Sequence, residues 1–290
     1  MKIAVASGKG GTGKTTVAIA LALALVHQGR QVSYLDCDVE GPNAHLFLKP
    51  EIETHAAVNK LVPQVDARRC NACGRCAEVC QYHAIVTLGG KTLVFPELCH
   101  GCGSCTLECP QEAITEVPVQ LGQLEAGPVQ AGLTWGRGLL DVGEPMAVPV
   151  IRQLKAWRPN QENQITIWDA PPGTSCPVVE TLRGADYLLL VTEPTPFGLH
   201  DLRLAAELAR ELQIQAGVII NRADIGNAQV EAFCQQAGMP VLLQIPFEHR
   251  IAAGLAQGQT LTEIKPEYIT RFQDLFAHLV ESQAVQEAQP

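Results

Sequence analysis

The sequence predicts an α/β protein with a doubly wound, mostly parallel sheet, interrupted by a small α+β module. Three observations support this fold class: a glycine-rich loop between a strand and a helix, short apolar runs along the second half, and a cysteine-rich block. Short apolar runs that end in polar turns are typical of parallel strands buried on both faces. With 290 residues, 47% of them hydrophobic, the chain can bury such a sheet and carry a second unit.

The first candidate site is a glycine-rich loop that matches the phosphate-binding pattern G-x-x-x-x-G-K-[ST]. Residues 2–6 predict the strand before the loop, and residues 14–28 predict the helix after it. Backbone N–H groups can surround phosphate oxygens, while Lys14 reaches the β/γ-phosphates and Thr15 helps to hold Mg²⁺. The residues expected to bind nucleotide here are Gly8, Lys9, Gly10, Gly11, Thr12, Gly13, Lys14, Thr15 and Thr16.

Carboxylates follow two further predicted strands. The strand 32–35 leads into Asp38, and the strand 165–168 leads into Asp169. Because ligands bind at the carboxyl ends of strands in open α/β sheets, we expect Asp38 to position water and Asp169 to lie on the Mg²⁺ side. The N–H group of Gly173 can sense the γ-phosphate. The alternative in each case is an ordinary polar turn after a strand.

Eight of the eleven cysteines form two runs with the spacing C-x₂-C-x₂-C-x₃-C. The second run lies 29 positions after the first (99 − 70 = 29), so the unit is duplicated. This is the bacterial-type two-cluster ferredoxin pattern, in which each fourth cysteine ligates the other cluster. The pattern implies two 4Fe–4S clusters: cluster A on Cys70, Cys73, Cys76 and Cys109, and cluster B on Cys99, Cys102, Cys105 and Cys80.

Zinc is the competing interpretation of these cysteines, although zinc sites usually take pairs of C-x₂-C with a longer spacer. Structural disulfides are a further alternative. One departure from the ferredoxin pattern is Gln81, which stands where a proline would follow Cys80. We expect the ferredoxin module to span 61–118, between Pro63 and Pro118, so that the nucleotide-binding domain covers 1–60 and 119–290.

The position of Lys9, directly after the first glycine, makes the loop similar to the deviant Walker A motif of the MinD/Mrp (SIMIBI) class of P-loop ATPases. This class includes the ParA-type partition ATPases and the nitrogenase iron protein. The resemblance implies ATP hydrolysis with Mg²⁺ and a nucleotide-dependent homodimer, in which Lys9 reaches the partner's nucleotide. It also implies that Lys9, Lys14 and Asp38 are catalytic residues. It also places Gly173 in the second switch and a base pocket on Asn221, Arg222, Pro246 and Phe247. A solvated surface lysine is the alternative for Lys9.

Over nearly its full length, the chain resembles MinD-superfamily ATPases with an inserted ferredoxin domain. We interpret it as an ATP-hydrolysing dimeric switch coupled to electron transfer through two 4Fe–4S clusters to an unknown redox-partner protein. One alternative is an iron–sulfur cluster scaffold or carrier of the Mrp type, and another is a redox-sensing regulatory ATPase. Cys176 is either a ligand of a dimer-bridging cluster or a small buried residue.

Charge and hydropathy exclude other functions. A net charge of −9 argues against nucleic-acid binding. The apolar run 17–26 is too short to cross a bilayer, and the acidic amphipathic helix expected over 268–284 lacks the basic face of a membrane-surface helix. We therefore expect a cytoplasmic protein with reduced thiols and no membrane contact. The glycine-rich segment 119–150 is expected to form short strands or a loop, followed by a helix over 148–156.

Overall fold

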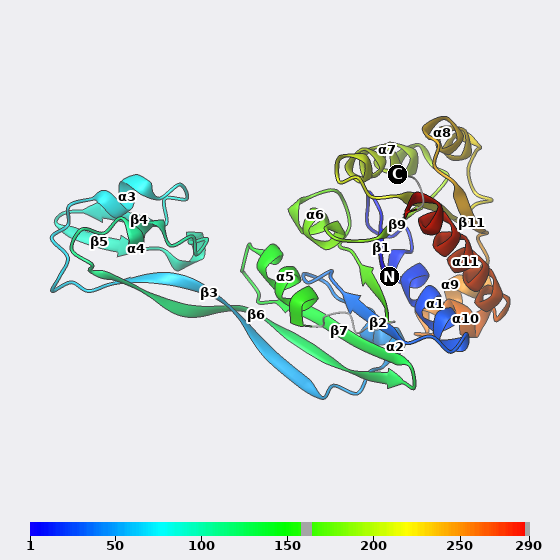
Figure 1. The fold of residues 1–290 in the computed structure, drawn as a ribbon, viewed down its shortest axis with the longest axis horizontal. Helices are drawn as coiled ribbons and strands as arrows, with labels where there is room; N and C mark the ends of the chain where they lie inside the picture. Colours follow the sequence, from blue (N-terminus) through cyan, green and yellow to red (C-terminus); the bar gives the residue numbers. More distant parts are fainter. Residues whose placement is uncertain (158–163, 288–290) are drawn as a thin grey trace. The chain divides into compact units, whose positions relative to one another are not determined.

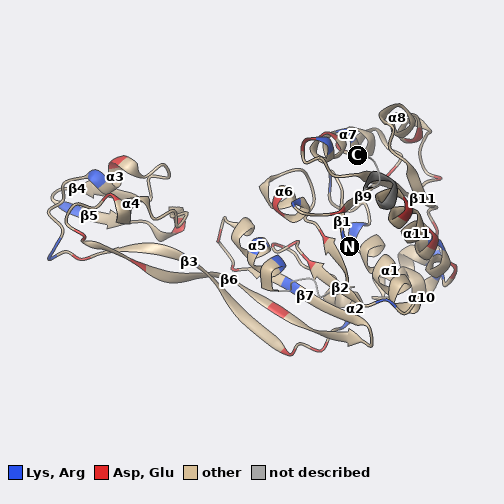
Figure 2. Ribbon diagram, in the orientation of Figure 1, with Lys and Arg blue, Asp and Glu red and all other residues tan. Residues whose placement is uncertain are grey.

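The computed structural model describes residues 1–157 and 164–287, with side chains described as far as residue 283. It contains two compact units (Figure 1). The large unit comprises Met1–His55, Leu124–Leu139 and the chain from Ile151 onward. The cysteine unit comprises Ala56–Gln123 and Leu140–Val150. Lys and Arg are interspersed with Asp and Glu along the described elements of each unit (Figure 2).

A mostly parallel sheet organises the large unit and confirms the predicted α/β class. The strand order is β11-β10-β9-β1-β8-β2-β7-β6-β3, and the pairings from β11 to β7 are parallel. Because its six main strands are parallel to one another, their carboxyl ends meet at one edge, where ligands bind in such sheets. These strands are β1 (Lys2–Ala6), β2 (Val32–Asp36), β8 (Ile165–Asp169), β9 (Tyr187–Thr192), β10 (Ala216–Asn221) and β11 (Val241–Ile245).

Helices cover both faces of this sheet (Figure 1). On one face lie α1 (Lys14–His27) and α11 (Glu267–Glu287), and on the other lie α6 (Cys176–Leu182) and α7 (Pro196–Glu211). The remaining helices of this unit are α2 (His45–Leu48), α8 (Gln229–Ala237), α9 (His249–Ala256) and α10 (Leu261–Ile264), together with the part of α5 (Ala147–Trp157) from Ile151 onward. Within the described chain, none of the helices combines the length and the apolar character needed to cross a membrane.

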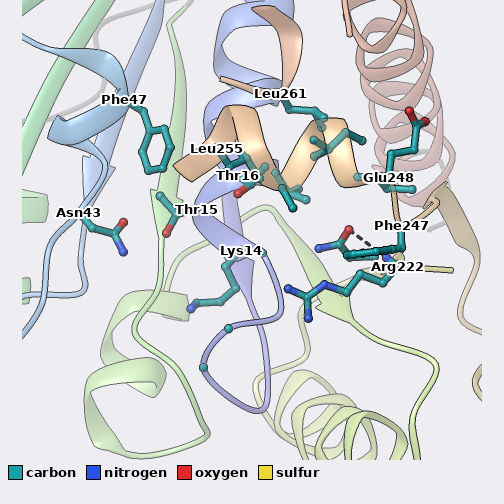
Figure 3. Close-up of a pocket in the computed structure, with 18 of the residues that line it drawn as sticks. Lys14, Thr15, Thr16, Asn43, Phe47, Arg222, Phe247, Glu248, Leu255 and Leu261 are labelled. Carbon is teal, nitrogen blue, oxygen red and sulfur yellow. Dashed lines mark hydrogen bonds between the residues drawn. The ribbon is translucent and has the colours of Figure 1, made fainter. Parts of the chain in front are cut away.

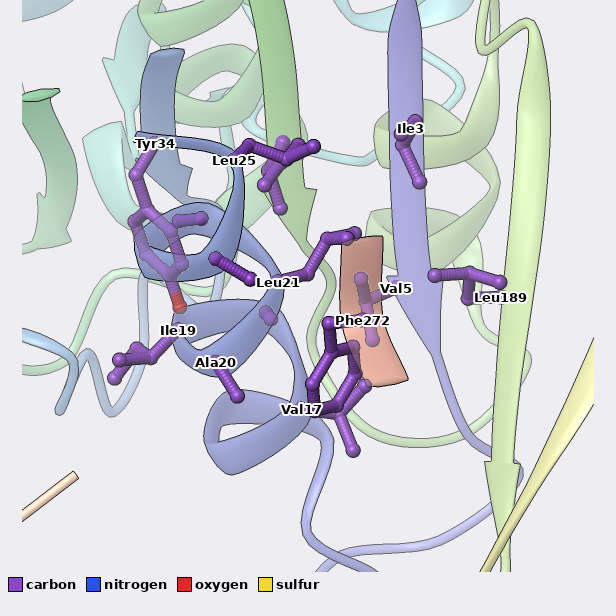
Figure 4. Close-up of a cluster of buried hydrophobic side chains, with 14 of the residues drawn as sticks. Ile3, Val5, Val17, Ile19, Ala20, Leu21, Leu25, Tyr34, Leu189 and Phe272 are labelled. Atoms are coloured by element: carbon purple, nitrogen blue, oxygen red, sulfur yellow. The ribbon is translucent and has the colours of Figure 1, made fainter. Parts of the chain in front are cut away.

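The first helix, α1, is buried on almost all sides. Leu21 and Leu25 are fully buried between the sheet and Phe272 of α11 (Figure 4). Gln273 of α11 donates a hydrogen bond to the carbonyl of Ala24 at 3.0 Å, which ties the two helices together. A helix that is apolar all round is stable only when it is enclosed, so packing on the sheet and α11 holds α1 in place.

The expectation of short strands or a loop over 119–150 is correct in part, because the segment forms strands, but they are longer than expected. The chain there forms two strands, β6 (Ile114–Gln130) and β7 (Leu133–Leu140), joined by a turn in which Gly132 has a φ of 86°. Glycines that suggest a loop serve packing instead, because a Cβ at Gly127 would collide with the backbone of Glu51. Such close approach is a known role of glycine inside strands. The helix expected at 148–156 is confirmed as α5.

The cysteine unit is built from β3 (Thr54–Val65), the first part of β6, and four short elements. These are α3 (Arg75–Val79), β4 (Ile85–Leu88), β5 (Lys91–Val94) and α4 (Ser104–Leu107), with the 3₁₀ turn η1 (Pro96–Leu98) before α4. Strands β4 and β5 pair in an antiparallel hairpin. Two small apolar clusters form its core, and both include cysteine side chains.

The unit is wider than the expected range 61–118. Pro63 and Pro118 do not bound it, because β3 and β6 continue through both prolines. Residues 140–150 also belong to it, since Glu144 pairs with Lys60 at 2.9 Å and the Lys60 side chain is only 4% exposed. A buried lysine needs such a partner, and this pairing between distant residues carries no local sequence signal.

Replacing Leu21 by Ala should lower the free energy of unfolding of the large unit by about 2–5 kcal/mol, because it leaves a cavity in a fully buried position. Leu204→Ala on α7, where the leucine is 42% exposed, should cost less than about 1 kcal/mol. Urea titration followed by tryptophan fluorescence measures this, because Trp135, Trp157 and Trp168 all belong to the large unit. Equal losses for the two variants would contradict the packing described for α1.

Candidate nucleotide site and cysteine cavities

The phosphate-binding loop connects β1 to α1 and curls above the first turn of the helix. Gly11 and Gly13 have φ values of 79° and 94°, which only glycine adopts without strain. The carbonyl of Thr12 accepts a hydrogen bond from Asn221 Nδ2 at 2.8 Å, so the end of β10 supports the loop. The first N–H groups of α1 therefore face the site with the positive end of the helix dipole.

A cavity of about 340 Å³ lies beside this loop (Figure 3), and ligand pockets commonly start near about 300 Å³. Eleven of the expected site residues line it: Gly10, Gly11, Gly13, Lys14, Thr15, Thr16, Asp38, Asn221, Arg222, Pro246 and Phe247. The residues expected in the site that do not line the cavity are Gly8, Lys9, Thr12, Gly173 and Asp169.

Three carboxylates lie at the carboxyl ends of β2 and β8: Asp36 and Asp169 are the last residues of these strands, and Asp38 follows β2. Asp169 is buried and accepts a hydrogen bond from the Tyr34 hydroxyl at 2.8 Å, while its Oδ1 has no hydrogen-bond partner among the described residues. Burial raises its pKa, and Lys14 and Thr15 oppose the shift. Asp38 lines the cavity, and burial raises its pKa against the attraction of Lys14.

Asp36 is the buried carboxylate that connects this group to the backbone. It accepts hydrogen bonds from the N–H groups of Asp38, Asn43 and Ala44 at 3.2, 3.0 and 3.1 Å. Burial, followed by repulsion from Asp169, raises its pKa to about 8. Neighbouring carboxylates and a buried oxygen without a partner fit a hard divalent cation such as Mg²⁺, which prefers oxygen ligands.

The far end of the cavity is lined by both polar and apolar side chains. Asn221 ends β10 and Arg222 follows it, while Pro246 and Phe247 follow β11. The N–H group of Phe247 donates a hydrogen bond to Asp224 Oδ1 at 2.6 Å. Ten further residues that the predicted site does not include also line this cavity: Val17, Asn43, Phe47, Pro172, Ile245, Glu248, Ile251, Ala252, Leu255 and Leu261. Most lie on short helices or turns, so no strand-end pattern indicates them.

Lys9 forms an ion pair with a carboxylate that the sequence motifs do not include. Its Nζ lies 3.3 Å from Oε2 of Glu193, which follows β9 and is buried. Arg222 Nη1 lies 2.6 Å from the other oxygen of the same carboxylate. The signal that could have found Glu193 is its position at the carboxyl end of a central parallel strand, where Asp38 and Asp169 also lie.

Cysteine side chains line two separate cavities in the cysteine unit. One cavity is lined by Cys70, Cys73, Cys76 and Cys109, and the other by Cys80, Cys99, Cys102 and Cys105. Each group thus contains three cysteines of one run and the fourth of the other. Among the described residues, no three His, Cys, Asp or Glu side chains meet closely enough to hold a single metal ion.

The two fourth cysteines have matching surroundings. Cys80 Sγ accepts a hydrogen bond from the N–H group of Ala84, and Cys109 Sγ accepts one from that of Ala113, both at 3.3 Å. N–H groups aimed at sulfur stabilise thiolate ligands. Cys37 and Cys234 are buried away from both cavities, and burial raises their thiol pKa values. Cys176 is exposed at the start of α6.

The fold and the loop define a P-loop nucleotide-binding protein with a MinD-like parallel sheet. A family comparison gives the narrower assignment: the profile of the CobQ/CobB/MinD/ParA nucleotide binding domain matches residues 3–261. The chain therefore belongs to this family of P-loop proteins.

Known proteins are similar to this chain over most of its length. The uncharacterized protein MJ0578 of Methanocaldococcus jannaschii is 29% identical over 282 residues, 97% of each chain. The cytosolic Fe-S cluster assembly factor NUBP2 of Rattus norvegicus is 27% identical over 283 residues, 91% of this chain and 86% of that protein. The septum site-determining protein MinD of Pyrococcus horikoshii, solved with Mg-ADP, superposes with a TM-score of 0.58 at 20% identity, covering 100% of this chain and 99% of that one.

Gly13→Ala should weaken Mg-ADP binding at least tenfold, because alanine at a positive φ costs about 1–2 kcal/mol. Its Cβ would also lie 2.5 Å from Asn221 Nδ2 and displace the hydrogen bond to Thr12. Gly41→Ala is the matched control, since a Cβ there meets nothing within 4 Å. Isothermal titration calorimetry measures both affinities. Unchanged binding by the Gly13 variant would show that the loop geometry does not govern affinity.

Proposed function

We propose that the chain is an ATPase that binds two 4Fe–4S clusters in its cysteine unit and acts on them through its nucleotide state. The observation that carries this proposal is the grouping of eight thiols around two cavities, in a chain whose other unit has a P-loop nucleotide site. Family membership supports ATP binding and hydrolysis. The inserted ferredoxin domain and its clusters are our own inference.

In the nucleotide site, the loop N–H groups and Lys14 bind the phosphates. Thr15 and Asp169 hold Mg²⁺, and Asp38 orients the water that attacks the γ-phosphate. The base lies against Asn221, Arg222, Pro246 and Phe247, while Gly173 detects the γ-phosphate. Two copies meet across their bound nucleotides, and Lys9 of each copy reaches the nucleotide of the other. The polar and apolar parts of the cavity support this assignment of the residues that line it.

In the cysteine unit, each cavity provides four thiolates for one cluster. Cys70, Cys73, Cys76 and Cys109 hold cluster A, and Cys99, Cys102, Cys105 and Cys80 hold cluster B. The clusters supply one-electron chemistry, with potentials that depend on hydrogen bonds to sulfur and on solvent exposure. The N–H groups of Ala84 and Ala113 provide two such hydrogen bonds.

Two uses of the clusters are compatible with this arrangement. In the first, ATP hydrolysis controls electron transfer through resident clusters to a redox-partner protein, and the interlocked thiols support that use. In the second, the protein is a scaffold or carrier that hands clusters to other proteins. The comparisons favour the second use, because the relative NUBP2 is named as a cytosolic Fe-S cluster assembly factor. The same name supports a cytoplasmic location. A redox-sensing ATPase is a third, less supported function.

Anaerobically purified protein separates these uses. We expect about eight irons per chain if two four-iron clusters are bound. Resistance to a chelator, with EPR-monitored potentials that shift when Mg-ATP is added, indicates ATP-controlled electron transfer. Iron that moves to an apo-acceptor protein in an ATP-dependent way indicates a carrier. Tightly held clusters whose potentials do not change when nucleotide is added indicate a redox-sensing ATPase. Fewer than about two irons would contradict the cluster proposal itself.

Removing one thiol from either cavity should remove one cluster. We expect Cys73→Ser and Cys102→Ser each to lose about four irons, because each removes one ligand of a four-iron cluster. Cys176→Ser should keep the full iron content, since Cys176 lies at the start of α6 and lines neither cysteine cavity. Iron analysis and EPR of the three variants measure this. Loss of iron from the Cys176 variant alone would show that Cys176 is a cluster ligand and would contradict the assignment of Cys73 and Cys102.

Hydrolysis should depend on the loop and on Asp38. Lys14→Ala should abolish ATP hydrolysis and weaken nucleotide binding, because the lysine supplies the positive charge that binds the phosphates. Asp38→Asn should lower kcat by about 10²-fold or more while nucleotide affinity changes little, as expected for a residue that acts on the attacking water. A phosphate-release assay and nucleotide titration provide the two numbers. An Asp38 variant with normal kcat would exclude its catalytic role.

A further inference from the structure

Glu193 is a buried carboxylate that sits between the two parts of the nucleotide site. Its side chain is 7% exposed, and one oxygen lies 3.3 Å from Lys9 Nζ while the other lies 2.6 Å from Arg222 Nη1. Arg222 lines the nucleotide cavity (Figure 3), whereas Lys9 does not. One carboxylate therefore joins the lysine of the phosphate loop to an arginine at the base end of the site.

The backbone around Glu193 leaves it little freedom. Gly198, in the first turn of α7, lies so close that a Cβ there would collide with the carbonyl of Glu193. Gly226 packs equally closely on the carbonyl of Pro194, and the N–H group of Asn227 donates to that carbonyl at 3.3 Å. The backbone that carries the Glu193 side chain is thus held between α7 and the loop after β10.

The two cations are freer than the carboxylate. The side chains of Lys9 and Arg222 are 33% and 44% exposed, so either can turn toward solvent or a ligand. A buried charge that loses its only partner is strongly destabilising. Because Glu193 has two partners, it remains neutralised when one of them leaves.

We propose that Glu193 is a positioning residue that holds Lys9 away from the nucleotide in the single chain, and that Arg222 allows Lys9 to leave by neutralising Glu193 alone. This inference rests on the proposed nucleotide-dependent dimer, in which Lys9 reaches the partner's nucleotide. It predicts opposite effects for the two neighbours of Lys9. Loss of the Glu193 charge frees Lys9, whereas loss of the Arg222 charge leaves Lys9 as the only counter-charge and holds it more firmly.

The first test measures the hold on Lys9 directly, without nucleotide and in the full chain. The rate of acetylation of the Lys9 amine by acetic anhydride, followed by peptide mass spectrometry, should rise several-fold in Glu193→Gln and fall in Arg222→Met. The double variant E193Q/R222M, which removes both charges, should behave like Glu193→Gln. Equal Lys9 rates in the wild type and in Glu193→Gln would overturn the inference.

Glu180→Gln is the matched control. Glu180 is also a largely buried carboxylate of the large unit shared by two cations, with Arg152 at 3.1 Å and Arg183 at 4.0 Å, and its side chain is 13% exposed. Its replacement should leave the Lys9 rate unchanged. A rise in this variant equal to that of Glu193→Gln would show that the effect comes from general loosening of the fold, which also overturns the inference.

The second test measures release. Light scattering after size exclusion should show the dimer of Glu193→Gln forming at a several-fold lower concentration of a non-hydrolysable Mg-ATP analogue than the wild type requires. Arg222→Met should need a higher concentration. In a Lys9→Ala background the Glu193 change should have no effect, because it acts through Lys9. A shift that persists there would overturn the inference, as would shifts of the same sign for the two single variants.

The two tests also separate this inference from the proposed function. A wild-type chain that never dimerises with nucleotide contradicts the proposed dimer and the release of Lys9 toward it. The acetylation rates still decide whether Glu193 holds Lys9. A wild type that dimerises, together with equal acetylation rates, contradicts the role of Glu193 and leaves the ATPase proposal standing.

Discussion

The nucleotide site depends on the enclosure of α1. This helix is apolar on nearly every side, and it is held between the central strands and α11 by fully buried side chains such as Leu21 and Phe272. Because the phosphate-binding loop is the connection from β1 to α1, its two ends are fixed by this packing. The loop can then keep Gly11 and Gly13 at positive φ, with backbone N–H groups aimed at a ligand.

Charge burial is the second constraint. The large unit buries Asp36 and Asp169 under the loop and Glu193 beside it, although burying a carboxylate is unfavourable. Each is compensated differently: Asp36 by backbone N–H groups, Asp169 by the attraction of Lys14 and the Tyr34 hydroxyl, and Glu193 by two cations. The carboxylates under the loop thus keep negative charge that suits Mg²⁺, whereas Glu193, with two cationic partners, can release a lysine and stay neutralised.

The sequence alone predicts those parts of the structure that local patterns encode. The strands of the parallel sheet and the helix after the loop are confirmed, because apolar runs and glycine positions report directly on backbone geometry. Glu193, Phe47 and Lys60 were not found, since their importance comes from contacts with residues that are distant in the sequence. The same reason explains why the strands over 119–150 are longer than expected, since glycines allow β6 to pack against Glu51.

The duplication in the cysteine unit extends to the backbone. Residues with positive φ recur at the same offset in both halves: Ala72 and Gly101, Gly74 and Gly103, His83 and Glu112. The two halves thus repeat one chain path, yet each completes its ring of thiols with a cysteine from the other. If each group of four thiols holds a cluster, cluster binding in one cavity orders cysteines from both halves of the unit. This ordering prepares the other cavity to bind its own cluster. Iron loading would then be cooperative, with half-filled chains scarce during maturation.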